Sequence, residues 1–238
     1  MGSADWTFST NSLSSPTVVR NPTSGVTPPV GGGNYIYAMH SRAVQTGAVA
    51  LFGNQVGFAP MPFGGIIHGA VAKLISAGGT NFGGGLFFSC QGADIADLAY
   101  ILALSEADPA HLILKKAALN GGFSDEAPNP TVNKILRRST ITFAQDQYAQ
   151  FRLRVIDQPG GDVVLKCQYN DLTTGGASVV TPTWIDVPGM LPFTDDVTQI
   201  NTGSAPLIGG RAGKVAMFRD VNRRIAFDQI VIEKQNSL

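Results

Sequence analysis

The sequence predicts an antiparallel jelly roll or β-sandwich with an extended Pro/Gly-rich N-terminal region. Short apolar segments occur along the whole chain, and in several of them apolar and polar residues alternate with the period of two that a strand requires. Clusters drawn from 28 Gly and 14 Pro residues separate these segments, as turns separate strands. No long segment repeats with the 3.6-residue period of a helix, so the strands are expected to form antiparallel sheets packed face to face.

The clearest strands lie in the second half of the chain. Residues 136–143 form one expected strand, and residues 150–156 alternate strictly, with Phe151 among the apolar residues on one face. The sequence of residues 157–161 (DQPGG) is typical of a tight turn, and residues 162–169 alternate again. A hairpin over residues 150–169 is therefore predicted.

Two closing strands are expected at residues 213–218 and 224–233, the last of them within a sheet rather than as a dangling end. Residues 98–104 are expected to pair with residues 110–118 in a second hairpin, and a helix over residues 94–103 is the alternative. Further strands are expected at residues 6–8, 35–41, 47–52, 64–74 and 83–91.

The N-terminal region contains a long segment, residues 20–33, that reads as a loop or an arm. Stretches of this length without secondary structure are uncommon inside a compact domain and often contact a neighbour. We otherwise expect residues 1–238 to form one domain, since all-β domains commonly reach this length.

Composition narrows the classes of partner. Lys and Arg together number 17, as do Asp and Glu, so the net charge is zero. Nucleic-acid binding through phosphates and attraction to an anionic membrane both require a basic excess, and neither is expected. Charged residues form only 14% of the chain, which suits a surface buried against copies of itself or other subunits. No secretory signal is recognisable, so synthesis in the host cytoplasm is expected.

Cysteine and histidine give no sign of a metal centre. Cys90 and Cys167 each lie in an apolar, strand-like run outside any Cys-x-x-Cys spacing. Two buried free thiols are favoured, and a disulfide between them stays open. The histidines His40, His68 and His111 are scattered, so each is interpreted as a structural residue.

Residues in the second half resemble the concanavalin A-like lectin and glucanase jelly rolls. Residues 151–155 and 161–165, followed by residues 169–171, resemble the central hairpin of that family, and residues 210–213 and 225–232 resemble its closing strands. Together with residues 46–52, the whole chain resembles virion-associated proteins of tailed bacteriophages.

The resemblance implies a fold that serves enzymes, lectins and coat proteins alike, so function depends on the site. Enzymes of the family use a Glu-x-Asp-x-x-Glu strand, which this sequence lacks. The acidic groups nearest to it fall in turn-rich segments, and we predict no catalytic residue, no cofactor and no metal. Calcium held by oxygens of Asn170-Asp171 or Asp195-Asp196 is the lectin-like alternative. The acidic groups considered are Asp94 with Asp97, Asp125 with Glu126, and Asp195 with Asp196.

Three adjacent basic pairs remain, Lys115-Lys116, Arg137-Arg138 and Arg223-Arg224. Adjacent residues of a strand point to opposite faces, so one member of each pair must turn inward or stand at a sheet edge. The favoured interpretation is an edge charge that blocks unwanted strand pairing, and contact with an acidic neighbouring subunit is the second.

These observations predict a structural component of a bacteriophage particle, a capsid cement, decoration or tail-associated subunit. It would act through contacts with capsid or tail proteins and with copies of itself, and it would reside in the virion. The alternative is a non-catalytic carbohydrate-binding module used in host attachment, with a glycan as its ligand.

Overall fold

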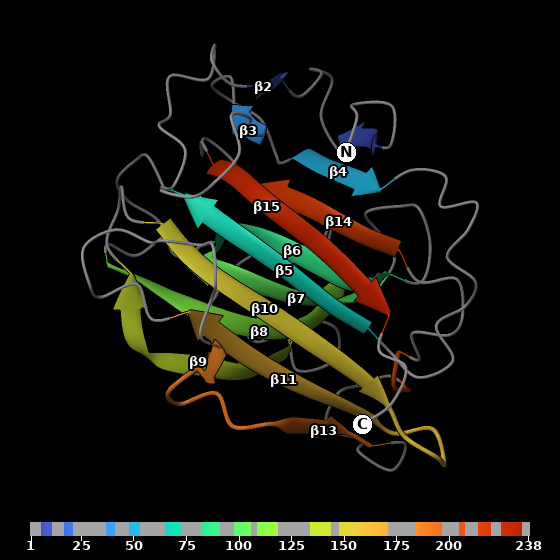
Figure 1. The fold of residues 1–238 in the computed structure, drawn as a ribbon. Coiled ribbons are helices and arrows are strands. Elements are labelled where there is room, and N and C mark those ends of the chain that lie inside the picture. Colours follow the sequence, from blue (N-terminus) through green and yellow to red (C-terminus); the bar gives the residue numbers. More distant parts are fainter. Residues whose placement is uncertain are drawn as a thin grey trace.

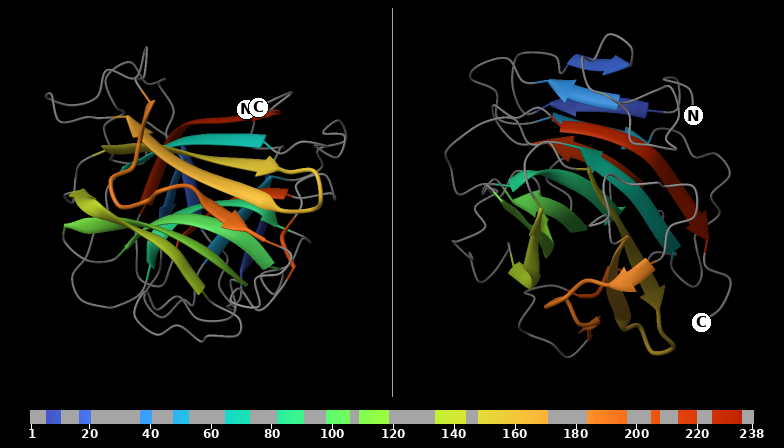
Figure 2. Two further views of the ribbon diagram at one scale, coloured as in Figure 1. Left: turned by 90° about the horizontal axis from the view of Figure 1, so that it is seen from below. Right: turned by 60° about the vertical axis from the view of Figure 1, so that its left-hand side comes forward.

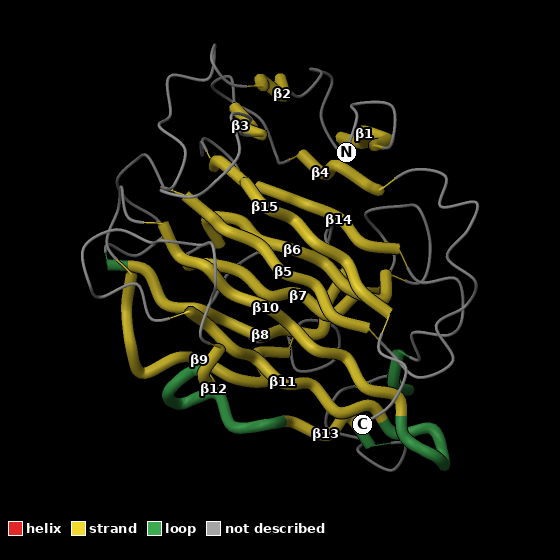
Figure 3. Tube along the Cα trace, in the orientation of Figure 1, coloured by secondary structure: helices red, strands yellow, loops and turns green. Residues whose placement is uncertain are grey.

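A computed structural model describes the backbone and side chains of residues 98–105, 109–117, 135–143, 151–170, 184–196 and 205–207. For the other strands it gives the backbone path alone. The described residues form strands, turns and short connections, with no helix among them (Figure 3). Within this part of the chain, accordingly, no helix is long and apolar enough to cross a membrane.

Two antiparallel sheets lie one in front of the other (Figure 1). Sheet A has the order β1-β4-β14-β6-β7-β8-β9, and sheet B the order β12-β11-β10-β5-β15-β3-β2, with β13 also paired to β11. Seen from below, the sheets form two layers (Figure 2). The strands of sheet A are β1 (Trp6–Thr10), β4 (Ala48–Phe52), β6 (Phe82–Cys90), β7 (Leu98–Ser105), β8 (Ala110–Ala118), β9 (Lys134–Phe143) and β14 (Lys214–Arg219). Those of sheet B are β2 (Thr17–Arg20), β3 (Tyr37–His40), β5 (Gly65–Ala72), β10 (Tyr148–Asp157), β11 (Val163–Asn170), β12 (Trp184–Asp186), β13 (Phe193–Asp195) and β15 (Ile225–Lys234).

The core lies between the two sheets and follows directly from the alternation in the sequence. Every second residue of β10 and β11 faces β7, β8 and β9, and these residues are almost fully buried. The inward-facing apolar residues of the cluster are Tyr100, Leu102, Leu104, Ala110, Leu112, Leu114, Leu136, Phe143, Phe151, Leu153, Val155, Val163, Leu165, Cys167, Tyr169, Val187, Met190 and Leu207.

Strands β7 and β8 are buried on both faces. Ile101 and Ile113 point away from the inter-sheet core, yet both are at most 1% exposed. This explains why β7 reads as a continuous apolar run instead of an alternating one. The same continuous run suggested a helix over residues 94–103; residues 98–103 are strand, so the helical alternative is wrong there.

The β10–β11 hairpin has the predicted strands and turn. Phe151 pairs with Tyr169, and Val155 with Leu165. In the turn, the N–H of Gly161 donates to the carbonyl of Gln158 over 3.1 Å. Pro159 follows Gln158, and Gly160 adopts a φ of 100°. This combination is a type II turn, which requires a residue tolerant of positive φ at its third position.

The other expected strands are confirmed, with ends shifted by a few residues. β7 pairs with β8, β9 covers the strand expected at residues 136–143, and β15 lies between β5 and β3, inside sheet B. Strands β2, β12 and β13 were not predicted. Beyond Arg20, the arm expected at residues 20–33 lies outside the described residues. Cys167 is a buried free thiol, as favoured, which excludes a disulfide with Cys90.

Residues 184–196, which we call the edge segment, close one side of the sandwich. Its strands β12 and β13 both pair with β11 in sheet B. Between them, the carbonyl of Pro188 accepts a hydrogen bond of 2.9 Å from the N–H of Thr140 on β9, in sheet A. Val187 and Met190 are 2% and 1% exposed and belong to the core cluster. The edge segment therefore links the two sheets by backbone hydrogen bonds and by buried side chains.

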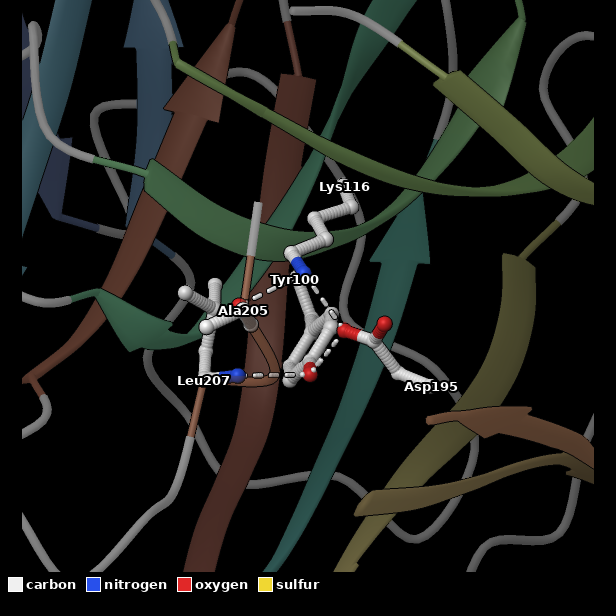
Figure 4. Close-up of polar contacts among 5 residues, drawn as sticks. All are labelled: Tyr100, Lys116, Asp195, Ala205 and Leu207. Carbon is white, nitrogen blue, oxygen red and sulfur yellow. Dashed lines mark hydrogen bonds and ion pairs between the residues drawn. The ribbon is translucent and has the colours of Figure 1, made fainter. Parts of the chain in front are cut away.

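A buried polar cluster joins the sheets beside the edge segment (Figure 4). Nζ of Lys116, on β8, lies 2.6 Å from Oδ2 of Asp195, on β13, and the two side chains are 1% and 0% exposed. The hydroxyl of Tyr100 donates to the same Oδ2 over 2.6 Å and accepts the N–H of Leu207 over 2.9 Å. Lys116 also donates to the carbonyl of Ala205 over 2.8 Å. Each polar side chain of the cluster is thus hydrogen-bonded, as burial demands.

We expect Gly189→Ala to destabilise the fold, because Gly189 lies where the edge segment contacts β9. Gly189 has a φ of 83°, and a Cβ there would lie 2.7 Å from Cγ2 of Thr140 and 2.8 Å from its backbone N. The clash adds to the positive-φ strain of about 1–2 kcal/mol. Gly160→Ala is the matched control, because Gly160 also has positive φ but nothing lies within 4 Å of its added Cβ. Urea denaturation should show the larger loss for Gly189→Ala, and equal losses would contradict the close contact with β9.

Candidate glycan-binding face

Five polar or aromatic side chains form a continuous ladder on the outer face of sheet B. We call Arg152, Lys166, Gln168, Trp184 and Asp186 the polar ladder. They come from β10, β11 and β12, which are neighbours in sheet B, and their positions alternate with the inward-facing core residues. The register places Arg152 opposite Gln168, and Gln168 opposite Asp186.

Each member of the ladder contacts the next. Nε of Arg152 donates to Oε1 of Gln168 over 2.8 Å, and Nε2 of Gln168 donates to Oδ1 of Asp186 over 2.9 Å. Nζ of Lys166 lies 3.2 Å from the same Asp186 oxygen. At the other end, the guanidinium carbon of Arg152 lies 4.6 Å from the centre of the Trp184 ring. This distance is within the range of a cation–π contact.

Burial differs along the ladder. Gln168 is only 7% exposed, and hydrogen bonds to Arg152 and Asp186 hold its amide. The side chains of Lys166 and Asp186 are 29% and 47% exposed, and Arg152 and Trp184 are half-buried. The ladder therefore combines a rigid centre with two accessible ends.

The same face carries three cationic side chains on β10 and β11. Arg154 neighbours Lys166 across the β10–β11 pairing, and Arg152 lies two residues before Arg154 on the same strand. Nε of Arg154 is buried and has no hydrogen-bond partner among the described residues. A buried donor without an acceptor is uncommon in a folded protein. This part of sheet B suits a ligand that supplies acceptor oxygens or negative charge.

The acidic pair Asp195-Asp196 does not form a loop-based cation site. Asp195 belongs to β13 and is held by Lys116 and Tyr100. The turn interpretation of Asp195 is therefore wrong: its carboxylate is part of the core. Among the described residues, no group of three or more His, Cys, Asp or Glu side chains could hold a metal ion. Asn170 is 7% exposed; Asp171, Asp94, Asp97, Asp125 and Glu126 lie outside the described residues.

The basic pairs differ in where they lie in the sheets. Lys115-Lys116 lies on β8, an interior strand, so an edge role for this pair is wrong. Both side chains are 1% exposed, on opposite faces, and Lys116 is the member turned into the core. Arg137-Arg138 lies on β9, at the edge of sheet A, as expected. The guanidinium carbon of Arg137 lies 4.8 Å from the ring centre of Phe193 in the edge segment. Arg223-Arg224 lies outside the described side chains.

The described histidine is structural. Nδ1 of His111 lies 3.0 Å from the carbonyl oxygen of Ser139, and the backbone N–H of His111 donates to Oγ of Ser105 over 2.8 Å. These contacts tie β8 to its neighbours. The side chains of His40 and His68 lie outside the described residues. The register places His68, on β5, opposite Arg152, on β10.

Comparison with known proteins supports the fold. No family model matches the chain, and no curated protein matches it. Among solved structures, the cellulose-induced protein superimposes with a TM-score of 0.52 at 13% identity, over 99% of this chain and 94% of that one. The carbohydrate esterase of the Shiga toxin-encoding bacteriophage phi24B gives 0.48 at 16% identity, over 97% and 90%. A carbohydrate-binding module from Bacillus subtilis gives 0.47 at 8% identity, over 96% and 95%. The first likeness supports the β-sandwich, and identities this low say nothing about activity.

The ladder should contribute to stability mainly through its buried centre. Gln168→Ala removes two hydrogen bonds and leaves partners unsatisfied, so we expect a loss of about 1–2 kcal/mol. Lys166→Ala removes only a solvent-exposed ion pair, and we expect a change within about 0.5 kcal/mol. Chemical denaturation of the two variants measures both values. A larger loss for Lys166→Ala would mean that the exposed ion pair, and not the amide, organises the ladder.

Proposed function

We propose that this chain is a non-catalytic module that binds an anionic glycan on the outer face of sheet B. The observation that carries the proposal is the polar ladder, in which an Arg152–Trp184 stack stands beside hydrogen-bonded amide, carboxylate and ammonium groups. Aromatic surface next to fixed donors and acceptors matches the two kinds of surface that a sugar ring presents, its C–H faces and its hydroxyls.

The chemistry of the ladder favours an acidic sugar. Arg152, Arg154 and Lys166 offer charged donors to a carboxylate, sulfate or phosphate, and charge-assisted hydrogen bonds are the stronger kind. The ladder is built on strands and its central amide is fixed by neighbours. Binding to such a preorganised surface loses little side-chain entropy.

The absence of catalysis is part of the proposal. Glycoside cleavage by the usual route requires two carboxyl groups on either side of the scissile bond. Within the polar ladder Asp186 is the one carboxylate, and it is bonded to Gln168 and Lys166. Residence in a phage particle, with host glycans as the ligand, fits the sequence resemblance and belongs to the same proposal.

Binding should be visible through the fluorescence of Trp184. The chain has two tryptophans, so Trp6→Phe leaves Trp184 as the single reporter. On an array of acidic and neutral glycans we expect retention of acidic members. Titration with a retained glycan should shift the Trp184 emission. Arg152→Ala should weaken binding at least about tenfold, equivalent to about 1.4 kcal/mol.

The control for this experiment is Arg138→Ala. Arg138 is an exposed arginine on β9 of sheet A, away from the ladder face, and its loss should leave glycan affinity unchanged. A folded protein that retains no glycan, or one whose binding survives Arg152→Ala, would overturn the proposal. Retention of neutral glycans alone would show that the ligand is a glycan but not an anionic one.

A second candidate, the structural subunit of a phage particle, is favoured by apolar residues on the edge segment. Leu191 is 74% exposed and Ile185 is 39% exposed, and the carbonyl of Leu191 accepts a hydrogen bond from Arg137 of the edge strand β9. When a partner covers a large exposed apolar side chain, its apolar surface leaves water, and this favours association.

Co-sedimentation tests this second candidate. Light scattering first gives the mass of the free protein, and sedimentation with empty capsids or tails then gives its stoichiometry on the particle. Leu191→Asp should abolish a fixed stoichiometry, because a desolvated carboxylate opposes burial. Thr142→Asp, at an exposed position of β9, is the control and should co-sediment normally. If the protein co-sediments with neither capsids nor tails, this role is excluded.

A further inference from the structure

The buried cluster brings together the two functional groups from which an amide is made. Lys116 and Asp195 are separated by 79 positions in the sequence and come from opposite sheets. Their amine nitrogen and carboxylate oxygen lie 2.6 Å apart, and their side chains are 1% and 0% exposed (Figure 4). Lysine and aspartate are rarely buried to this extent.

The position of the nucleophile is fixed. The carbonyl of Ala205 holds Nζ of Lys116 from a second side at 2.8 Å, and the Tyr100 ring centre lies 5.9 Å from that nitrogen. Nζ therefore rests against the carboxyl group of Asp195 with little freedom to leave it. Holding two reactants in this manner raises their effective concentration far above any value in solution.

The surroundings weaken the charged form of the amine. Burial lowers the pKa of Lys116, while its hydrogen bond and charge interaction with Asp195 oppose that shift. The hydroxyl of Tyr100 donates to Oδ2 of Asp195 and so withdraws electron density from the carboxyl group. Burial, together with the charge of Asp195, raises the pKa of this phenol, so it remains a donor.

A second carboxylate lies in register with the first. Asp157 on β10 is the partner of Val163 on β11, and Val163 is in turn the partner of Asp195 on β13. The charge of Asp157 contributes to the raised pKa of Tyr100, which places it within electrostatic reach of the cluster. Asp157 is half-buried and lies two strands from Asp195 in the same row of sheet B, so it acts on the cluster through its charge.

We propose that Lys116 and Asp195 condense into an intramolecular amide bond that covalently links β8 of sheet A to β13 of sheet B. A proton first passes from the ammonium of Lys116 to the carboxylate of Asp195. The neutral nitrogen then attacks Cγ, the Nζ–Cγ bond forms and the Cγ–Oδ2 bond breaks. One water molecule leaves, carrying Oδ2 and two hydrogens that began on Nζ, and the third hydrogen stays on the amide. No oxidant, reductant or cofactor is required, and Asp157 and Tyr100 are positioning groups for proton movement.

Mass spectrometry tests the bond directly. The folded protein, incubated at neutral pH, should have an intact mass lower than that of its sequence by one water molecule, and this deficit should persist in denaturant. Proteolysis should yield a branched peptide that joins the segment of Lys116 to the segment of Asp195. Lys116→Met should restore the full mass. Asp157→Asn should slow the appearance of the deficit while leaving the circular dichroism spectrum unchanged.

Two controls distinguish the amide from a cyclic imide formed within the backbone. Asp195→Asn should lose ammonia in place of water if the same carbon is attacked, whereas cyclisation of an aspartate with its own backbone would keep the water loss in Lys116→Met and give no branched peptide. Lys166→Met replaces a partly exposed lysine on the outer face of sheet B and should keep the deficit. A wild-type protein that is folded by circular dichroism and retains the full mass after prolonged incubation would overturn the proposal. This outcome is independent of glycan binding, which rests on the opposite face of β11.

Discussion

The contact between Lys116 and Asp195 constrains the rest of the described structure. Two charges buried in a sandwich core lose their hydration, and they are tolerated only when each satisfies the other with good geometry. At 2.6 Å, with Tyr100 on the same oxygen, the pair meets this requirement. Removing one partner of such a pair typically costs about 3–5 kcal/mol, because the remaining charge stays uncompensated. Sheet A and sheet B are thus held at a fixed offset by polar as well as apolar contacts.

The geometry of the edge segment follows from that constraint. Asp195 fixes β13 against β11, and β13 ends the edge segment of which β12 is the beginning. Val187 and Met190 enter the core between these two strands, and the carbonyl of Pro188 caps the edge of β9. The polar ladder therefore depends on the core: Trp184 and Asp186 stand on β12, whose position is set by contacts made on the other side of the sheet.

Sequence patterns were sufficient where a strand buries one face and exposes the other. The alternation of Phe151, Leu153 and Val155 defined β10, and Pro159-Gly160 defined its turn. Strands β12 and β13 have three residues each, too few for any period to be recognised. The edge role expected for Lys115-Lys116 failed because the neighbours of a strand depend on topology and not on its own residues. The ion pair itself joins positions 79 apart, a distance over which no local pattern operates.

The two candidate functions are compatible in physical terms. A single shallow ladder with a half-buried Trp184 and two partly exposed ends offers limited buried area, so one copy would bind a glycan weakly. Many copies displayed on one particle would bind together, since each attached copy raises the effective concentration of the next. Weak sites gain most from such repetition when they are rigidly oriented, because flexible linkage spreads the copies over unproductive geometries. A sandwich whose sheets are fixed to each other by Lys116 and Asp195, and whose ladder is fixed to that frame by the edge segment, meets this condition.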